Sequence, residues 1–119
     1  MGEISQVRAV LEEIKHLEHV QEVSLVSRGG MYVLGDGPKG VHLETYAAMS
    51  GIMVGAAETT AAELKDDLKH VIIKLTDRDL ILMGASNRYI LCITTDGKDE
   101  GNKVSKSAAQ IISKADLNF

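Results

Sequence analysis

The sequence predicts an α+β fold in which a five-stranded antiparallel sheet lies between helices, in the order α-β-β-α-β-β-β-α. Three observations predict this class. Apolar residues recur at helical spacing near both ends of the chain, β-rich runs occupy residues 22–37 and 70–95, and an uncharged run separates them at 45–57. The strands within each run are too close for parallel crossovers, so they are expected to pair antiparallel. The length of 119 residues suits one domain over residues 1–119.

An amphipathic helix is predicted at each end of the chain. The first has apolar residues every three or four positions: Ile4, Val7, Val10, Leu11, Ile14 and Leu17. The last follows a charged loop at 97–103 and runs from Val104 to Ala115. Each of these helices has one apolar side that can pack on the sheet.

Five β-rich segments make up the predicted sheet. They are residues 22–28, 31–37, 70–76, 79–86 and 89–95. The first two form a hairpin, with Gly29 and Gly30 able to take positive φ at the turn. The runs VIIKL, LILMGA and ILCI are almost continuously apolar, which implies that both faces of the sheet are covered. We therefore expect the two terminal helices on one face and the middle helix on the other.

The uncharged run from Thr45 to Ala57 is predicted to be this middle helix. This run would form a helix roughly 20 Å long. A helix that crosses a bilayer needs a longer run, of roughly 20 apolar residues, so no membrane span is expected. Ala, Met and Gly are poor strand formers, which argues against a strand. At 100° per residue one broad side could lie on the sheet: Leu43, Tyr46, Ala47, Met49, Ser50, Met53, Val54, Ala57, Ala61 and Leu64.

The opposite side of this helix is small and nearly uncharged. It carries Ala48, Gly51, Ile52, Gly55 and Thr59. Two glycines inside a helix cost about 1 kcal/mol each relative to Ala, and close approach of another backbone would offset that cost. No segment of the same chain is expected there, so we predict a symmetric homodimer in which this side meets its copy. Two alternatives stay open: a terminal helix crosses to this side, or the side lies in water.

Composition excludes some partners. The net charge is −4 and there is no basic run, while aromatic residues make up 3% of the chain, so nucleic acid is not an expected partner. Cys92 is the only cysteine, which rules out an internal disulfide and suits a reducing compartment. The first residues do not resemble a secretion signal. A cytoplasmic location is expected.

A glycine-rich loop precedes the middle helix. Gly35, Gly37 and Gly40 match the spacing G-x-G-x-x-G. Pro38 removes a backbone donor where a phosphate would bind, and the hairpin before the loop excludes a parallel βαβ unit. An ordinary turn is expected, with weak anion binding near Lys39 as the alternative.

The residues that could carry chemistry do not form a recognisable site. His16 and His19 are three apart, His42 and His70 are isolated, and no partnering Cys or carboxylate pattern completes a metal site. Cys92 lies in an apolar strand and is expected to be structural.

The acidic side chains in connections are expected to be solvated: Asp66, Asp67, Asp77, Asp79, Asp96, Asp99 and Glu100. Arg28, Arg78 and Arg88 lie at hairpin ends, where one of them could touch a nucleotide on a partner, but nothing selects one. No catalytic residue, metal or cofactor is expected.

The chain resembles the roadblock family, which comprises dynein light chains and bacterial and archaeal regulators of small Ras-like GTPases. VSLVSRGGMYVLGDG is similar to the opening hairpin of that family, ETYAAMSGIMVGAAETTAAEL to its small-residue second helix, and DLILMGASNRYILCITTD to its closing strands. The resemblance spans essentially the whole chain and implies the roadblock/profilin-like three-layer architecture. No catalytic signature accompanies it.

The resemblance also implies a mode of assembly and a partner. Two sheets would join edge to edge through the third strand, at Val71, Ile73, Lys74 and Leu75, with the second helices side by side. Self-pairing would also cover an otherwise hazardous apolar edge. The expected function is a non-enzymatic regulator or scaffold that binds a Ras-like small GTPase. The alternative is a small-ligand sensor similar to profilin-like or PAS-like domains, with a cavity between the sheet and the second helix.

Overall fold

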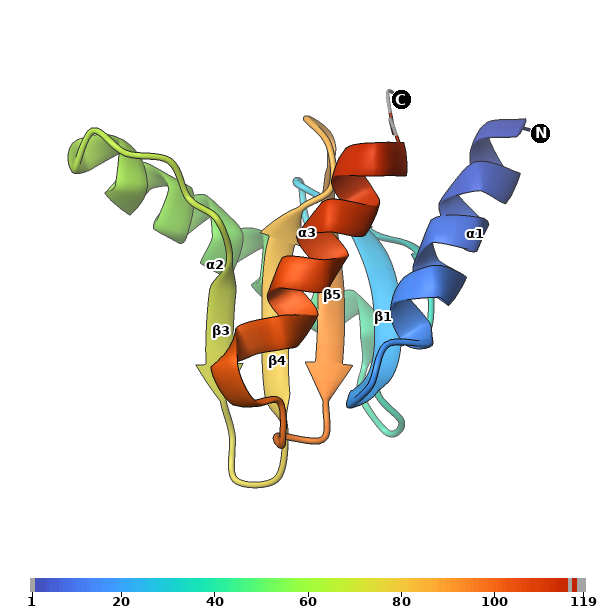
Figure 1. Cartoon of the computed structure of the whole chain (residues 1–119). Coiled ribbons are helices and arrows are strands. Elements are labelled where there is room, and N and C mark those ends of the chain that lie inside the picture. The colour runs from blue at the N-terminus through green and yellow to red at the C-terminus, as the bar shows by residue number, and fades with distance from the viewer. Residues whose placement is uncertain (1, 116, 118–119) are drawn as a thin grey trace.

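A twisted antiparallel sheet with helices on both of its faces forms the body of the protein (Figure 1). The structure is a computed structural model, and it describes residues 2–115 and 117. The elements are α1 (Gly2–Lys15), β1 (Val20–Ser27), β2 (Tyr32–Gly35), α2 (Leu43–Glu63), β3 (Val71–Lys74), β4 (Asp79–Gly84), β5 (Tyr89–Thr95), the 3-10 helix η1 (Glu100–Asn102) and α3 (Lys103–Ala115). The predicted element order is confirmed.

The strand order in the sheet is β2-β1-β5-β4-β3. Each neighbouring pair is antiparallel, as predicted. The first hairpin and the three-strand meander meet where β1 pairs with β5, from Ser27 opposite Tyr89 to Val20 opposite Thr95. The two short strands, β2 and β3, therefore form the two edges of the sheet.

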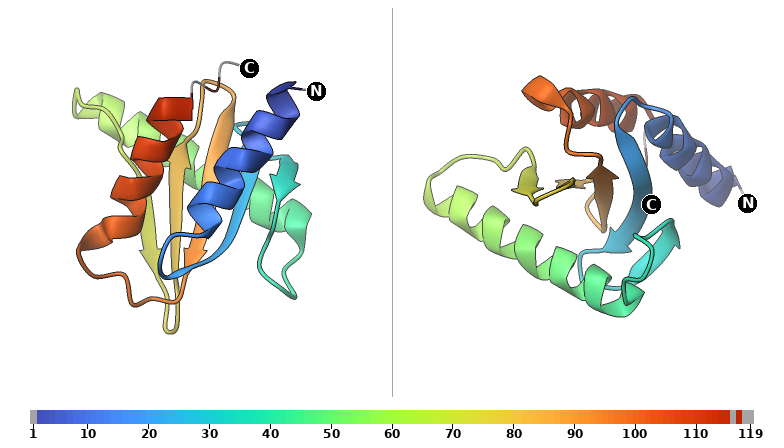
Figure 2. Two further views of the ribbon diagram at one scale, coloured as in Figure 1. Left: turned by 45° about the vertical axis from the view of Figure 1, so that its right-hand side comes forward. Right: turned by 90° about the horizontal axis from the view of Figure 1, so that it is seen from below.

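The helices divide between the faces as expected. Helices α1 and α3 lie side by side on one face, and α2 lies on the other (Figure 2). Because side chains alternate along a strand, Leu91 and Ile93 join the core under α1 and α3, while Ile90 and Cys92 join the core under α2. Both faces are covered, which explains why the central strands are almost continuously apolar.

Three details of this frame differ from expectation. Ile4 was predicted on the packed side of α1, but it is 57% exposed. In the hairpin turn Gly30 has a φ of 91°, whereas Gly29 is not among the residues with positive φ. The carboxylates Asp79 and Asp99 were expected to be solvated, but both are buried.

The two buried carboxylates have structural partners. Asp99 lies just before η1, which leads into α3, and it accepts hydrogen bonds from the backbone N–H groups of Lys103 and Val104, at 3.2 and 2.9 Å. These N–H groups have no partner inside the helix, so the carboxylate stabilises the start of α3. Asp79 pairs with the Lys74 ammonium at 3.0 Å across the β3–β4 hairpin.

A histidine–aspartate pair joins the α1–β1 connection to the residue that follows β5. His19 has a φ of 78°, and its Nδ1 lies 3.0 Å from Oδ2 of Asp96. The hydrogen bond with Asp96 raises the pKa of His19 above its ordinary value of 6.5. The same bond lowers the pKa of Asp96 below its ordinary value of 3.8.

The pair makes the stability of the fold depend on pH. A raised histidine pKa contributes stability that is complete below pH 6.5 and is lost as the pH rises through the folded-state value. A lowered aspartate pKa contributes stability above pH 3.8 that is lost on further acidification. We predict that His19→Asn, which still tolerates positive φ, destabilises the protein more at about pH 5.5 than at about pH 9. Urea unfolding at the two pH values measures the difference.

His16→Asn is the matched control, because His16 is exposed and its Nδ1 lies 2.7 Å from an uncharged group, the Glu12 carbonyl oxygen. The control variant should show a smaller difference in stability loss between the two pH values than His19→Asn. An equal loss of stability for His19→Asn at both pH values would contradict a charged pair.

Candidate functional site

Helix α2 crosses its face of the sheet, and its C-terminal end projects beyond the sheet next to β3 (Figures 1 and 2). Ala47, Ser50 and Val54 are buried against the strands, as predicted. Three residues predicted on the sheet side are instead exposed: Leu43 by 37%, Met49 by 46% and Leu64 by 75%. A helix that crosses a twisted sheet contacts it over only part of its length, so the predicted sheet side was too broad.

The close backbone approach predicted for α2 is present, but its partner lies in the same chain. A Cβ at Gly51 would lie 3.1 Å from Cα of Gly30 and 3.3 Å from the carbonyl oxygen of Arg28. A Cβ at Gly30 would in turn lie 3.1 Å from Cα of Ala48. The expectation that no segment of the same chain meets this side of α2 is therefore wrong for Ala48 and Gly51, which pack on the β1–β2 turn.

The remaining residues of that side face outward. Ile52 is 62% exposed, a Cβ at Gly55 would have no neighbour within 4 Å, and the Thr59 hydroxyl donates to the Gly55 carbonyl at 3.0 Å. We call Ile52, Gly55 and Thr59 the α2 strip. It is small, uncharged and open, as a surface for another helix would be.

The glycines of α2 do not leave the cavity that the sensor alternative requires. The space beside Gly51 is taken by the β1–β2 turn, and Gly55 faces away from the sheet. A hollow of about 950 Å³ lies on the opposite face instead, between α1, β2 and the β4–β5 turn.

Strand β3 forms an open edge of the sheet next to α2. It pairs with β4 on one side, from Val71 opposite Leu82 to Lys74 opposite Asp79, and it is the last strand in the sheet order. Of the residues predicted at the dimer edge, Val71 and Ile73 are half-buried, whereas Lys74 and Leu75 are exposed. The outer backbone groups of such an edge can pair with another strand.

An arginine that sequence reasoning did not single out as structural holds three elements together. The Arg28 guanidinium binds Glu58 of α2 at 2.7 Å and donates to the Ser86 carbonyl at 3.3 and 3.1 Å. A Cβ at Gly84 would lie 2.8 Å from one of its nitrogens. Arg28 is thus engaged within its own chain, and the glycine in the otherwise apolar β4 makes room for it.

The histidines and the thiol are not arranged as a reactive centre. In residues 2–115 and 117, no group of three or more His, Cys, Asp or Glu side chains could hold a metal ion. Burial raises the pKa of the Cys92 thiol to about 11, so its nucleophilic thiolate form is scarce at neutral pH. Cys92 is a buried member of the core under α2, as expected.

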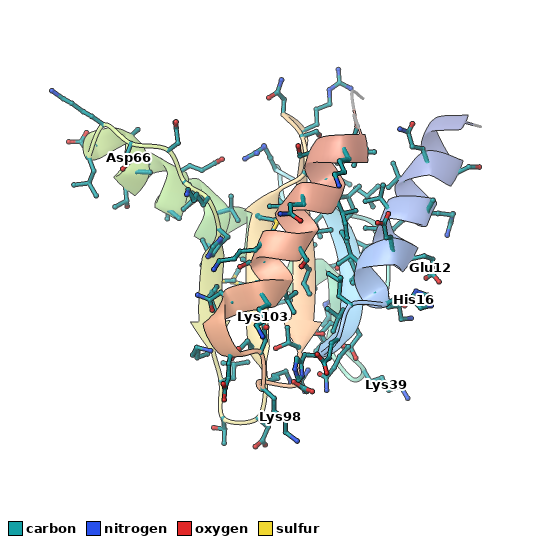
Figure 3. All side chains as sticks on the ribbon, viewed as in Figure 1. Glu12, His16, Lys39, Asp66, Lys98 and Lys103 are labelled. Carbon is teal, nitrogen blue, oxygen red and sulfur yellow. The ribbon has the colours of Figure 1, made fainter. Side chains whose placement is uncertain are left out.

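The glycine-rich loop is a connection from a hairpin to a helix. Strand β2 before it is antiparallel to β1, which confirms that the parallel βαβ unit of dinucleotide sites is not formed here. Gly35 and Gly40 have φ values of 102° and 77°, which fits tight turns. Pro38 is buried, and Lys39 is exposed at the end of the molecule away from the chain termini (Figure 3).

The arrangement of α2 and β3 presents a surface that another protein chain could contact. The α2 strip and the β3 edge are open, and helix α2 contacts β3. Within the described residues, no helix combines the length and the apolar character that crossing a bilayer requires.

Comparisons with known proteins agree on the fold. A family model described as Roadblock/LC7 domain matches residues 6–95. The structure is similar to gliding protein MglB from Thermus thermophilus, with a TM-score of 0.81 and 20% identity over 98% of this chain and 90% of that one. It is also similar to a Roadblock/LC7 domain from Streptomyces avermitilis, with a TM-score of 0.76 and 13% identity over 89% and 91% of the two chains.

A third similar structure is MglB with a tetrameric arrangement, with a TM-score of 0.73 and 18% identity over 97% of this chain and 93% of that one. A search of curated proteins found no match. Because the sequence identities are this low, the similarity to these solved structures supports the fold of the chain and nothing about its function.

The two glycines of α2 provide a matched pair of substitutions. Gly55→Ala adds a methyl group in open space and should raise the free energy of unfolding by up to about 1 kcal/mol through helix propensity. Gly51→Ala places the same group 3.1 Å from the Gly30 backbone, so we predict that it is less stable than Gly55→Ala by about 1–3 kcal/mol. Urea unfolding of dilute protein measures both. Equal stabilisation by both substitutions would show that α2 does not rest on the turn.

Proposed function

The chain belongs to the Roadblock/LC7 domain family, and from this premise we propose that it is a non-enzymatic homodimeric regulator or scaffold that binds a Ras-like small GTPase. The observation that carries the proposal is the open surface formed by the α2 strip and the neighbouring β3 edge. The proposed dimer interface comprises Ile52, Gly55 and Thr59 of α2 with Val71, Ile73, Lys74 and Leu75 at the β3 edge. Ala48 and Gly51, which were predicted to be part of it, pack on the β1–β2 turn instead.

The β3 edge supplies the first half of the interface. Its outer N–H and C=O groups have no neighbouring strand in the described sheet. An exposed apolar edge promotes uncontrolled pairing unless something covers it. Antiparallel pairing of β3 with its copy about a two-fold axis would cover both edges at once and join the two sheets. Lys74 pairs with Asp79 of its own chain at 3.0 Å, so its charge is already balanced there.

The α2 strip supplies the second half. Gly55 and Thr59 offer little bulk, so two copies of α2 could approach closely, and Ile52 would lose its water contact on docking. Gly51 and Ala48 take part mainly as support, because they hold the helix against the β1–β2 turn. One of the similar structures is an MglB assembly in a tetrameric arrangement, which fits self-association of this fold.

The GTPase is proposed from the family resemblance. Members of the family that this chain resembles serve as platforms for small GTPases or as adaptors in larger assemblies. A non-enzymatic role is supported by the state of the reactive groups: the pKa of Cys92 is raised to about 11 by burial, and Asp99 caps a helix. The single thiol is consistent with a reducing cytoplasm.

Ile52→Glu tests the assembly and the function together. Ile52 is 62% exposed, so the substitution should leave the subunit folded, while it places two like charges against each other in the dimer. We predict that the mass from light scattering falls from two chains to one. We also predict that a tagged wild-type chain, purified from its own cells, carries a small GTPase identifiable by mass spectrometry, and that Ile52→Glu carries less of it.

Ala109→Glu is the control, because Ala109 is exposed on α3, on the other face of the sheet. It should change neither the mass nor the recovery of the GTPase. A wild-type monomer would refute the dimer. A wild-type dimer from which no GTPase is recovered in repeated purifications would refute the partner and leave the dimer standing.

A further inference from the structure

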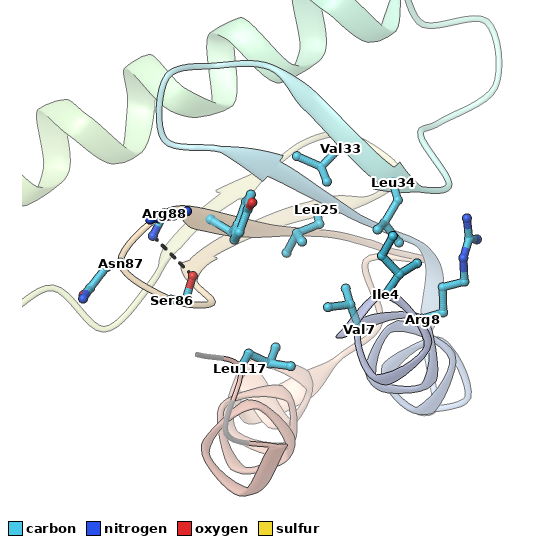
Figure 4. Close-up of a pocket in the computed structure, with 11 residues that line it drawn as sticks. Ile4, Val7, Arg8, Leu25, Val33, Leu34, Ser86, Asn87, Arg88 and Leu117 are labelled. Atoms are coloured by element: carbon cyan, nitrogen blue, oxygen red, sulfur yellow. Dashed lines mark hydrogen bonds between the residues drawn. The ribbon is translucent and has the colours of Figure 1, made fainter. Parts of the chain in front are cut away.

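A groove on the α1 side of the sheet plays no part in the proposed dimer. It has a volume of about 950 Å³ and lies between α1, β2 and the turn that joins β4 to β5 (Figure 4). Strands β2 and β3 are at opposite edges of the sheet. The grooves of both subunits therefore stay open when the β3 edges pair.

The floor of the groove is apolar. Val7 and Leu25 are buried at its base, and Leu34 and Leu117 also line it (Figure 4). The accessible part includes Ile4, which is 57% exposed, and Val33, which is 39% exposed. Single exposed apolar residues are normal on a protein surface, but apolar residues gathered in a hollow are typical of binding sites.

The rim of the groove is positively charged. Arg8 of α1 lies on one side of the groove, and Arg88 of the β4–β5 turn lies on the other side (Figure 4). Of the lining residues whose side chains the structure describes, none is acidic. The whole chain has a net charge of −4, so a rim of this sign is a local feature. Arginines on the two sides of an apolar floor favour a ligand with carboxylates at both ends.

The backbone of Arg88, from which its exposed side chain extends, is held by hydrogen bonds within the protein. Its carbonyl accepts the Arg28 N–H at 2.9 Å, and its own N–H donates to the Ser86 hydroxyl at 3.3 Å. The Arg28 guanidinium binds the Ser86 carbonyl on the same turn. The turn is thus anchored before any ligand arrives, which lowers the entropy lost on binding.

The groove continues along an edge of the sheet. A second hollow of about 490 Å³ shares Arg8, Val33 and Leu34 with the first. Its lining adds Glu12 of α1 and the ion pair of Lys15 Nζ and Asp36 Oδ2, which are 2.6 Å apart, so this continuation is mixed in charge. Strand β2 forms one wall and, as an edge strand, presents backbone groups that a second strand does not occupy. An elongated hollow along such an edge suits a chain segment better than a compact small molecule.

We propose that this groove binds a short peptide segment of a partner protein, in which apolar side chains lie between two acidic residues. The apolar side chains occupy the floor over Val7 and Leu25, and the acidic residues pair with Arg8 and Arg88. This inference goes beyond the proposed function and does not depend on it, because the groove and the β3 edge are separate surfaces. It would give each subunit of a dimer a second attachment point.

Selection from a random phage-displayed peptide library against the purified full chain tests the proposal. Enriched peptides should carry acidic residues on both sides of an apolar core. Their affinity, measured by fluorescence anisotropy, should fall about tenfold or more for Arg8→Glu and for Arg88→Glu. Val33→Glu should also weaken binding, because it adds a negative charge to the groove. Lys39→Glu is the matched control, since Lys39 is exposed at the other end of the molecule and should not affect affinity (Figure 3).

Three outcomes would overturn the proposal. The first is that no peptide is enriched, and the second is that enriched peptides bind the Arg8→Glu, Arg88→Glu double variant as tightly as wild type. The third is that sodium dodecanoate, and no selected peptide, shifts the amide signals of the groove, which would assign it to a small amphipathic anion. Light scattering on the same variants should show an unchanged mass, so a failure here is distinguishable from a failure of the proposed dimer.

Discussion

The contact between the backbones of Gly51 in α2 and Gly30 in the β1–β2 turn fixes where α2 lies. Side chains normally keep a helix away from its neighbours, but these two glycines allow a close approach. A Cβ at Gly51 would crowd the Gly30 backbone, and a Cβ at Gly30 would crowd the backbone of Ala48. Arg28 adds to the same junction, because its guanidinium binds Glu58 of α2 and the Ser86 carbonyl. The helix is therefore held by the hairpin at its middle, and its far end is free to project past β3 (Figure 1).

The surfaces of the molecule follow from that placement. With α2 held across one face and α1 and α3 across the other, the central strands are covered on both sides. What stays open is at the two edges: the α2 strip beside β3, and the groove beside β2. The first is uncharged and suits a copy of the same surface. The second is apolar with a basic rim and suits a different kind of partner, so the two edges can act independently.

Much of the fold could be predicted from the sequence, because it depends on local patterns. The periodicity of the terminal helices, the turn between Ser27 and Met31 and the continuous apolar strands indicated each element and the covered sheet. The small residues of α2 correctly indicated a close backbone contact, but periodicity does not say which backbone lies opposite, and Gly51 meets its own chain. The Arg28–Glu58 pair and the groove join residues far apart in sequence, so no local pattern indicates them. The hydrogen bonds of Asp99 are local, but a carboxylate in a charged loop was expected to be solvated. The dimer residues remain predictions.

The most direct test of this account is a nuclear Overhauser measurement on the unmodified protein. If α2 rests on the turn, the Hα protons of Gly51 and Gly30 are close enough for a strong cross-peak, since a Cβ at Gly51 would be 3.1 Å from Cα of Gly30. The account predicts that this cross-peak is present in dilute samples and does not depend on protein concentration. Its absence, or its appearance only when copies associate, would show that the close contact of α2 is with something other than its own hairpin.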